Sequence, residues 1–467
     1  MTTQNQFSFS PWKSPETNVN LTLSAKHLIS AGDTRLEMAA SEDLKEKLSA
    51  INDRYAVVKI GGSVGVADLS KCPPDILNPT AFEVLYKNKK FPRRMKDKYK
   101  HATLSSLWME WEFRREYDGG IAFAPGRVVP KNQLNLFTGF ATEPSGGSWD
   151  FMEGHLRENV CDGNEEYYEW LMSWFADIVQ NPGQKLGTAV CLRGRKGCGK
   201  SIVFDMFRKM IGTRYSAVIS QKKHLTGSFN KHLMSALFAQ VEEAVWAGDK
   251  EAEGHLKHLI TGDTIRIEPK GLDTFEVESF TRFGFTTNED WALPASADER
   301  RYFILDVSGA AMQKTDYFKR IVVQMENADG LGAWMKTLLE WQKPDWVDLR
   351  NPPKTDALGE QVLESLPVAQ KFFVEAVRSG QYFNEERDLE AAIDDIYPDY
   401  VEFVQERGAR QAANRQKFGH AQRAVWDFEM QEKRVNGAKT RVYTLPPLWE
   451  ARQMVADNLK ISIELLD

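Results

Sequence analysis

One stretch of the sequence has the composition and spacing of a phosphate-binding loop. Residues 194–201 read Gly-Arg-Lys-Gly-Cys-Gly-Lys-Ser, a full match to the pattern G-x-x-x-x-G-K-[ST]. Glycines let backbone N–H groups approach phosphate oxygens, and the start of a following helix adds the positive end of its dipole. We expect Lys200 to contact the β- and γ-phosphates of ATP and the Ser201 hydroxyl to ligate Mg²⁺. The expected nucleotide-binding residues are Gly194, Arg195, Lys196, Gly197, Cys198, Gly199, Lys200 and Ser201.

The residues on both sides of this loop predict the strand and the helix that such a site requires. An apolar run at 187–193 predicts a buried strand that leads directly into the glycines. Residues 201–211 have the apolar spacing of a helix, and Gly212 marks its end. The loop is therefore predicted to lie between a strand and a helix, the context in which this motif binds phosphate.

Two further predicted strands end in polar side chains suited to hydrolysis. The strand at 235–241 ends at Glu242 and Glu243, and the strand at 282–287 ends at Asn288. A carboxylate at a strand end coordinates Mg²⁺ or activates water, and an asparagine there orients the attacking water. We favour Glu243 as the base and Glu242 as the Mg²⁺ ligand, but the residues leave open which acid does which.

Two arginines precede the next predicted strand. Arg300 and Arg301 follow Asp298 and Glu299 directly in the sequence. An arginine presented to the ATP of a neighbouring subunit stabilises the charge of the transition state. A surface ion pair with either acid is the alternative interpretation.

The order of these features resembles that of the superfamily 3 helicases, and most of all the phage and plasmid primase–helicase proteins of the poxvirus type. The loop, the acidic strand end, the strand-terminal asparagine and the arginines follow one another within about 110 residues. The resemblance spans roughly 120–310. It is carried by 134–141, 194–201, 242–250, 256–261, 268–271, 287–291 and 298–301.

This resemblance implies an AAA+-type α/β core that works as a ring, usually a hexamer, with ATP at the subunit interfaces. It implies that Asn288 is the sensor residue and that Arg301, rather than Arg300, acts on the neighbouring subunit. Lys270 falls where the family places a lysine on a pore hairpin that contacts single-stranded DNA. Family members commonly have Asp at the position of Glu242, which leaves the division of labour between Glu242 and Glu243 open.

Composition excludes several other classes of protein. The chain has 467 residues, 42% of them hydrophobic, and a net charge of −6, which excludes a globally basic coat for nucleic acid. No apolar run reaches the length of a membrane span, and the amino terminus lacks a secretory signal pattern. The four cysteines form no C-x-x-C pair. We therefore expect a cytoplasmic protein with no membrane contact, in a bacterial host cell if a phage or plasmid encodes it.

The predicted fold class is α/β, with a P-loop AAA+-type core, a mixed α+β amino-terminal region and a mostly helical carboxy-terminal domain. We place an α+β domain with a β-hairpin at 1–130 and a helical collar for oligomerisation at 131–182. The ATPase core follows at 183–325 and the carboxy-terminal region at 326–467. Segment 406–441 holds nine Lys/Arg against four Asp/Glu and contains Asn436-Gly437, a strong hairpin signal. Helices followed by a basic hairpin predict a winged helix that contacts DNA; a regulatory or packing domain is the alternative.

The sequence therefore predicts an ATP hydrolase that acts as a DNA helicase or translocase in the replication of a phage, plasmid or similar element. ATP and Mg²⁺ are the expected cofactors, and single-stranded or forked DNA and further copies of the chain are the expected partners. A separate primase or polymerase is a further expected partner. Two alternatives stay open: a protein-remodelling AAA+ ATPase, and an ATP-gated origin-binding or assembly factor that does not unwind DNA.

Overall fold

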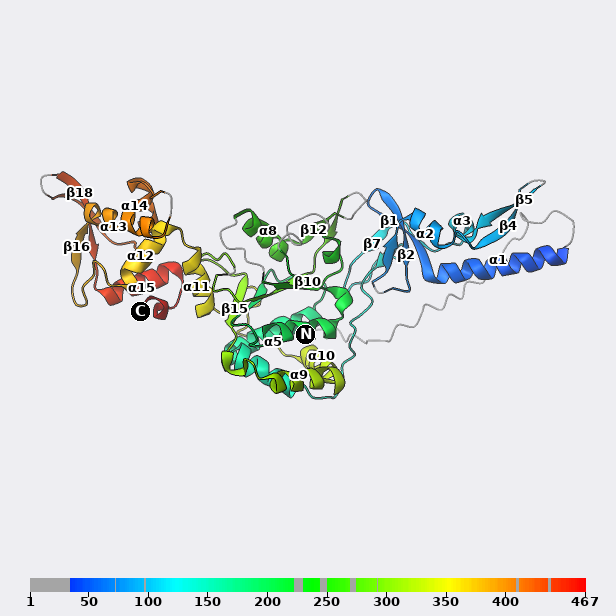
Figure 1. The fold of residues 1–467 in the computed structure, drawn as a ribbon, viewed down its shortest axis with the longest axis horizontal. Helices are drawn as coiled ribbons and strands as arrows, with labels where there is room; N and C mark the ends of the chain where they lie inside the picture. The colour runs from blue at the N-terminus through cyan, green and yellow to red at the C-terminus, as the bar shows by residue number, and fades with distance from the viewer. Residues whose placement is uncertain are drawn as a thin grey trace, which may run out of the picture.

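The computed structural model describes residues 34–71, 73–95, 98–221, 230–243, 250–268, 274–291, 293–408, 411–435 and 438–467. The molecule is elongated, with three lobes arranged along its long axis (Figure 1). A central lobe built on a parallel sheet separates an amino-terminal lobe from a carboxy-terminal lobe. Within the described residues, no helix has both the length and the apolar character needed to cross a membrane.

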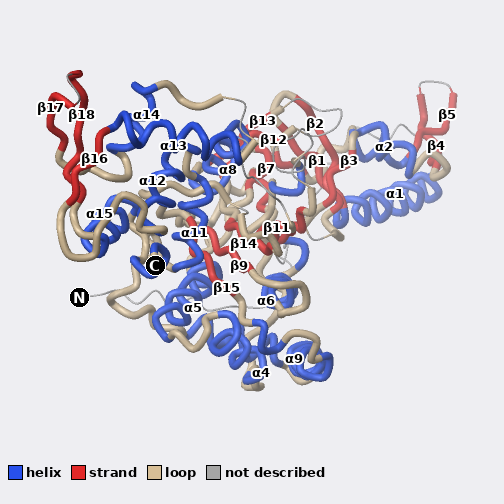
Figure 2. Tube along the Cα trace, turned by 60° about the vertical axis from the view of Figure 1, so that its left-hand side comes forward, coloured by secondary structure: helices blue, strands red, loops and turns tan. Residues whose placement is uncertain are grey.

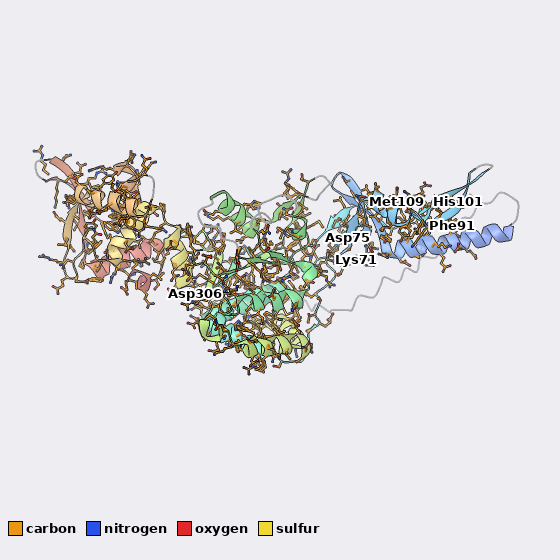
Figure 3. The ribbon with its side chains drawn as sticks, viewed as in Figure 1. Lys71, Asp75, Phe91, His101, Met109 and Asp306 are labelled. Carbon is orange, nitrogen blue, oxygen red and sulfur yellow. The ribbon has the colours of Figure 1, made fainter. Side chains whose placement is uncertain are left out.

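The amino-terminal lobe combines a long helix with short strands, which pair antiparallel except for β1 with β6 and β7 with β8. The predicted hairpin is confirmed, because β1 and β2 pair antiparallel with Ile60 opposite Ser63. Aromatic side chains such as Phe82 and Trp108 fill a small core of their own. Phe91, His101 and Met109 lie in this lobe (Figure 3). Its elements are α1 (Thr34–Arg54), β1 (Tyr55–Ile60), β2 (Ser63–Asp68), β3 (Asp75–Leu77), α2 (Pro79–Leu85), β4 (Lys90–Met95), β5 (Lys98–Thr103), α3 (Leu104–Met109), β6 (Glu116–Tyr117), β7 (Gly120–Ala122) and β8 (Gln133–Asn135).

The central lobe contains a five-stranded sheet in the order β10-β11-β14-β9-β15, with every neighbouring pair parallel. Strands β9 and β14 are buried along their whole length because elements cover both faces of the sheet. In Figure 1, α5, α9 and α10 lie below the sheet, and α8 and β12 lie above it. The strands are β9 (Ala189–Arg193), β10 (Ser216–Ile219), β11 (Phe238–Glu242), β14 (Arg282–Thr287) and β15 (Tyr302–Asp306).

Some of the helices that pack on this sheet precede its strands in the sequence, some connect them, and some follow them. Trp334 of α10 contacts Phe175 of α5 and Phe207 of α6, with ring centroids 5.6 and 5.8 Å apart. The elements are α4 (Asp150–Gly154), the π-helix η2 (His155–Val160), α5 (Glu165–Gln180), α6 (Lys200–Ile211), α8 (Lys250–Thr261), α9 (Thr315–Asn327) and α10 (Gly330–Glu340). Strands β12 (Thr264–Ile267) and β13 (Phe275–Glu278) form the hairpin predicted around Lys270, but Lys270 itself lies outside the described residues.

The packing divides the central and carboxy-terminal lobes later in the chain than the predicted boundary at 325/326. That boundary falls inside α9, and α10 beyond it shares the core of the central lobe. A second core begins at Leu363, within α11 (Asp356–Ser365). The reason is that α9 and α10 each bury an apolar face in the hydrophobic core of the central lobe.

The carboxy-terminal lobe has a three-stranded antiparallel sheet, in the order β16-β18-β17, packed on helices. The sequence pattern over 386–408 predicts a helix, but a strand at 389–392 precedes the helix, which begins at Ile393. The predicted hairpin is confirmed as β17 and β18, although Asn436 and Gly437 lie outside the described residues. Figure 2 shows α12, α13 and α14 beside these strands. The elements are α12 (Val368–Arg378), β16 (Leu389–Ala392), α13 (Ile393–Glu406), α14 (Arg415–Arg423), β17 (Met430–Val435), β18 (Ala438–Leu445) and α15 (Leu448–Leu459).

Candidate nucleotide site

The glycine-rich loop connects β9 to α6, as predicted, at the carboxyl edge of the sheet. Gly199 immediately precedes α6 and has a φ of 101°, in the left-handed region. A Cβ atom on Gly199 would lie 2.6 Å from ring atoms of His155 and Phe318. Only glycine therefore fits this position, for steric as well as conformational reasons.

The loop forms one wall of a cavity of about 560 Å³. The opposite wall comes from the ends of β11 and β14, and the topology brings together five groups of residues that are remote in sequence. The lining residues are Lys196, Gly197, Gly199, Lys200, Ser201, Ile202, Ser220, Glu242, Glu243, Thr286, Thr287, Asn288 and Phe318. The predicted residues Lys200, Ser201, Glu242, Glu243 and Asn288 thus share one cavity.

Three of these side chains form a continuous chain of hydrogen bonds. The buried Lys200 donates from Nζ to the carbonyl oxygens of Gly194 and Arg195, at 2.6 and 2.9 Å. It also donates to Asn288 Oδ1 at 2.9 Å. Asn288 in turn donates from Nδ2 to Glu243 Oε1 at 2.9 Å. The asparagine therefore links the ammonium group of the loop to a carboxylate at the end of the neighbouring strand.

The two acids occupy different environments. Glu242 is the last residue of β11, and its carboxylate accepts a hydrogen bond of 2.9 Å from Gln240. Glu243 is exposed and has a φ of 51°, and its backbone N–H donates to the carbonyl of Thr286. A non-glycine residue in this conformation carries strain that is typical of functional sites. The turn directs consecutive carboxylates into the same cavity.

These oxygen donors fit Mg²⁺. Within the described chain, no group of three or more His, Cys, Asp and Glu could hold a metal ion. Mg²⁺ is usually held through one or two carboxylates, substrate phosphates and water rather than by an all-protein cage. The Ser201 hydroxyl and the Glu242 carboxylate, which both line the cavity, are a donor set of that kind.

A second polar chain behind the loop was not predicted from the sequence. His155, at the start of the π-helix η2, is fully buried, and its Nε2 lies 3.1 Å from the carbonyl oxygen of Gly199. Because a carbonyl only accepts, Nε2 carries the hydrogen, and the neutral ring accepts at Nδ1 from Tyr317 Oη, 3.2 Å away. Asn159 donates to the same hydroxyl at 3.0 Å. Burial lowers the pKa of His155, and the bond to Gly199 partly opposes this. The only sequence signal for such a network is a lone histidine upstream of the loop.

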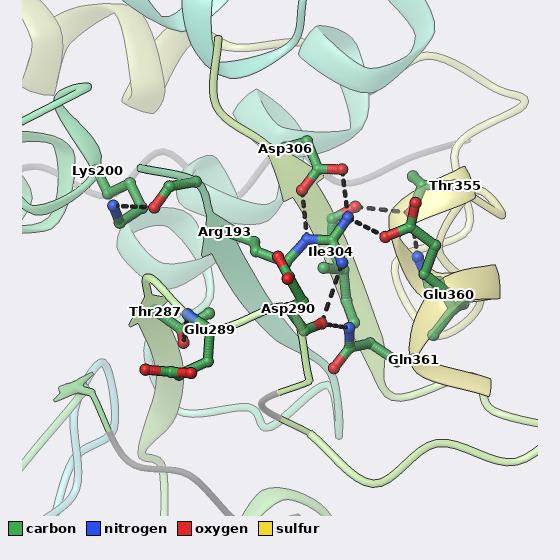
Figure 4. A network of polar contacts seen from close by, with 12 residues as sticks. Arg193, Lys200, Thr287, Glu289, Asp290, Ile304, Asp306, Thr355, Glu360 and Gln361 are labelled. Carbon is green, nitrogen blue, oxygen red and sulfur yellow. Dashed lines mark hydrogen bonds and ion pairs between the residues drawn. The ribbon is translucent and has the colours of Figure 1, made fainter. Parts of the chain in front are cut away.

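A third network fixes the residues that flank the loop and Asn288 (Figure 4). Arg193, the last residue of β9, donates to both carboxylate oxygens of Asp306, at 2.5 and 2.6 Å, and pairs with Glu360 of α11. It also donates to the backbone oxygen of Asp290, two residues after Asn288. Burial lowers the pKa of Arg193, but these bonds outweigh it and raise the pKa overall. Asp306 lies where the central lobe faces the carboxy-terminal lobe (Figure 3).

Arg300 and Arg301 do not join the cavity of their own chain. The backbone oxygen of Arg301 accepts from Ala189, the first residue of β9, so both arginines lie at the opposite edge of the sheet from the loop. Arg301 donates to Glu299 at 2.6 Å. The alternative of an ion pair with one of the two acids is thus found for Arg301, but the carboxylate is fully buried and the pair is not a surface pair. Arg300 is exposed.

Comparisons with known proteins give a family match for part of the chain. A family model described as "Family of unknown function (DUF5906)" matches residues 192–301, which run from the end of β9 to Arg301. The DNA primase-polymerase of Nitratiruptor phage NrS-1 is 23% identical over 189 residues. That similarity covers 39% of this chain and 26% of the relative, so the chain spans about a quarter of the length of the curated relative it matches.

Solved structures extend the similarity of fold to most of the chain. The apo structure of the NrS-1 C-terminal region has a TM-score of 0.58 and 14% identity, and covers 86% of this chain and 99% of that chain. The A form of the same region gives a TM-score of 0.57 over 85% of this chain and 98% of that chain. This chain therefore shares the fold of that region.

Proposed function

We propose that this protein is an ATP-dependent DNA helicase or translocase that acts in the replication of a phage or similar element. The observation that carries this proposal is the linked set of Lys200, Asn288 and Glu243 in one cavity beside the glycine-rich loop. A loop lysine, a polar residue that orients water and a carboxylate base are the parts that phosphoryl transfer to water requires.

In the proposed reaction, the loop amides and Lys200 bind the phosphates. Lys200 exchanges its bonds to Gly194 and Arg195 for phosphate oxygens. Bound Mg²⁺ would neutralise charge on the β- and γ-phosphates, with Ser201 and Glu242 as its protein ligands. Asn288 orients a water molecule, and Glu243 accepts its proton as the water oxygen attacks the γ-phosphorus. The bond between the γ-phosphorus and the oxygen that bridges it to the β-phosphate breaks with its electron pair on that oxygen, and ADP and inorganic phosphate leave.

The position of the arginines supports action between subunits. Arg300 and Arg301 lie at the end of the sheet opposite the glycine-rich loop, so they do not reach the ATP of their own chain. They act only on an ATP bound by a neighbouring copy of the chain. We therefore propose a ring with ATP at its interfaces and an AAA+-type core, and Arg301 as the residue acting in trans. The parallel sheet supports this core, because β9, which carries the loop, lies between β14, which ends just before Asn288, and β15, which follows Arg301. In this ring, Lys270 hairpins contact one DNA strand.

The relatives support a role in DNA replication. The similar protein of phage NrS-1 is named a DNA primase-polymerase, and this chain has the fold of its C-terminal region. Because only about a quarter of that protein is matched in sequence, we propose the motor function for this chain and place DNA synthesis in a partner primase or polymerase.

Strand separation tests this proposal directly. A forked DNA with a labelled strand is incubated with the full chain, Mg²⁺ and ATP, beside Lys200→Ala and the control Lys336→Ala, an exposed lysine on α10. We expect ATP-dependent separation by the parent and the control, and none by Lys200→Ala. Separation that does not need ATP, or that survives Lys200→Ala, would contradict the proposal.

A further inference from the structure

The carboxy-terminal lobe carries a cationic surface that the nucleotide site does not use. Helix α14 contains Arg415, Lys417, His420 and Arg423 and no acidic residue. Its buried residue Phe418 packs on Phe373 of α12 and Tyr400 of α13, with centroid distances of 4.8 and 4.6 Å. This packing fixes one face of α14 in the core and leaves the basic residues on the outside.

The adjoining hairpin places like charges opposite each other. In the antiparallel pairing of β17 with β18, Arg434 faces Lys439, and both are exposed. Directly opposed like charges destabilise an antiparallel pair. Lys439 is compensated by Glu432 at 2.7 Å, but no ion pair is found for Arg434 among the described residues. The hairpin thus retains an uncompensated charge where a bound anion would stabilise it.

Tyr443 connects this hairpin to the helix. Burial raises the pKa of Tyr443, and the positive charges of Arg441 on β18 and Arg423 on α14 oppose that rise. The charges of both arginines thus act on the same phenol, and Arg441 and Tyr443, two residues apart, share one face of β18. Both arginines are exposed, and the structure shows no ion pair for either within its described part. Two other cations of this surface are paired with acids, Arg415 of α14 with Asp394 and Lys433 of β17 with Glu390. Glu432, which pairs with Lys439, also lies opposite Arg441 in the hairpin.

We propose that α14 and the β17–β18 hairpin dock on duplex DNA, with Arg423, Arg434 and Arg441 on its phosphates. This deepens the proposed function, because it assigns the double-stranded part of the substrate to this lobe. Clustered cations that exceed the nearby acids in number gain affinity for a polyanion by counterion release. The width of the major groove, about 12 Å, admits a helix such as α14 while the hairpin lies along the backbone. The lobe has its own hydrophobic core, so DNA binding to this lobe does not require a change at the nucleotide site.

The test is binding of the full chain to a fluorescent 30-base-pair duplex without nucleotide, over a series of salt concentrations. The variant Arg423→Ser/Arg434→Ser/Arg441→Ser is compared with Lys314→Ser/Lys319→Ser/Lys336→Ser, which removes the same charge from exposed positions of the central lobe. We expect the first to bind at least tenfold more weakly. Its slope of log K against log salt should be shallower by about 2.7, or about 0.9 for each lost phosphate contact. The control should match the parent.

Equal affinity of the parent and the arginine variant, or an equal loss in the control, would overturn the proposal. An equal loss of affinity for a single strand of the same length would overturn the assignment to duplex. The hairpin variant Arg434→Glu/Lys439→Glu changes only exposed side chains and must also weaken duplex binding. ATP hydrolysis without DNA, measured on the same variants, should equal that of the parent. If the proposed motor function is wrong, ATP hydrolysis will be absent in the parent as well as in the variants, whatever their affinity for duplex DNA.

Discussion

Lys200 and Asn288, which are 88 residues apart in the sequence, are joined by a hydrogen bond of 2.9 Å from Nζ to Oδ1. The partners of Asn288 fix the orientation of its amide, because a lysine only donates and a carboxylate only accepts. Its oxygen faces the glycine-rich loop and its nitrogen faces Glu243. A change at the phosphates that moves Lys200 therefore reaches the proposed base through a single side chain.

Replacing Asn288 tests this relay. We expect Asn288→Ala to lower the kcat of ATP hydrolysis by about 10²-fold, the scale of losing one preorganised polar group at a reacting centre. The Kd for a fluorescent ATP analogue should change little, because the loop and Lys200 remain. Glu289→Ala, an exposed neighbour, is the matched control and should stay within about twofold of the parent. If both substitutions lowered kcat equally, the loss would come from disturbance of the turn that contains both residues and not from removal of the Asn288 amide.

The two consecutive acids are distinguished by how each variant responds to Mg²⁺. Glu243→Gln removes the proposed base and should lower kcat by about 10²–10⁴-fold with nucleotide binding retained. Glu242→Gln removes the proposed metal ligand and should raise the Mg²⁺ concentration needed for half-maximal hydrolysis. Titration of Mg²⁺ at saturating ATP gives both quantities. A reversed pattern would exchange the two roles.

His155 predicts a pH dependence of stability. Because burial lowers its pKa in the folded chain, the unfolded chain binds a proton first as the pH falls below about 6.5. The contribution of the neutral ring is thus complete above that pH and is lost as the pH falls towards the lowered pKa. The midpoint of thermal unfolding should drop between pH 7.5 and pH 5.5 by less in His155→Gln, which cannot titrate, than in the parent. Equal drops in both would show that this ring does not contribute.

The predicted and unpredicted parts of the site differ in the range of the interactions that form them. The apolar run, the glycines and the helix spacing at 187–212 are neighbours in sequence, so β9, the loop and α6 could be predicted. The contact between His155 and Gly199 joins residues 44 apart and depends on how η2 packs, for which the sequence has no local signal. Phe318 reaches the cavity from α9 for the same reason.

The carboxy-terminal lobe shows how tertiary pairing overrides local preference. Strand β16 has the sequence Leu-Glu-Ala-Ala, whose residues all favour helices. It is a strand because it pairs antiparallel with β18, with Ala392 opposite Val442. Strand propensity depends on such neighbours, so this element could not be predicted from its own residues. The hairpin of β17 and β18 could be, because its turn signal is local.

Arg193 should contribute to stability by holding three segments together. Arg193→Met removes its bonds to Asp306, Glu360 and Asp290, and we expect a loss of about 1–3 kcal/mol in the free energy of unfolding of the central lobe. The two carboxylates are about half exposed, so water compensates them in part. The midpoint of thermal unfolding measures the effect, with the exposed Arg350→Met as control. A shift no larger than that of the control would show that the network does not stabilise the fold.

In the proposed function, ATP hydrolysis in this cavity drives movement on DNA. The most direct measurement is the rate of ATP hydrolysis with and without single-stranded DNA, for the parent, Lys200→Ala and Lys270→Ala. We predict strong stimulation of the parent by DNA, no hydrolysis by Lys200→Ala, and hydrolysis by Lys270→Ala that no longer responds to DNA. Hydrolysis by the parent at the same rate with and without DNA would contradict a DNA motor. It would favour a protein-remodelling ATPase instead.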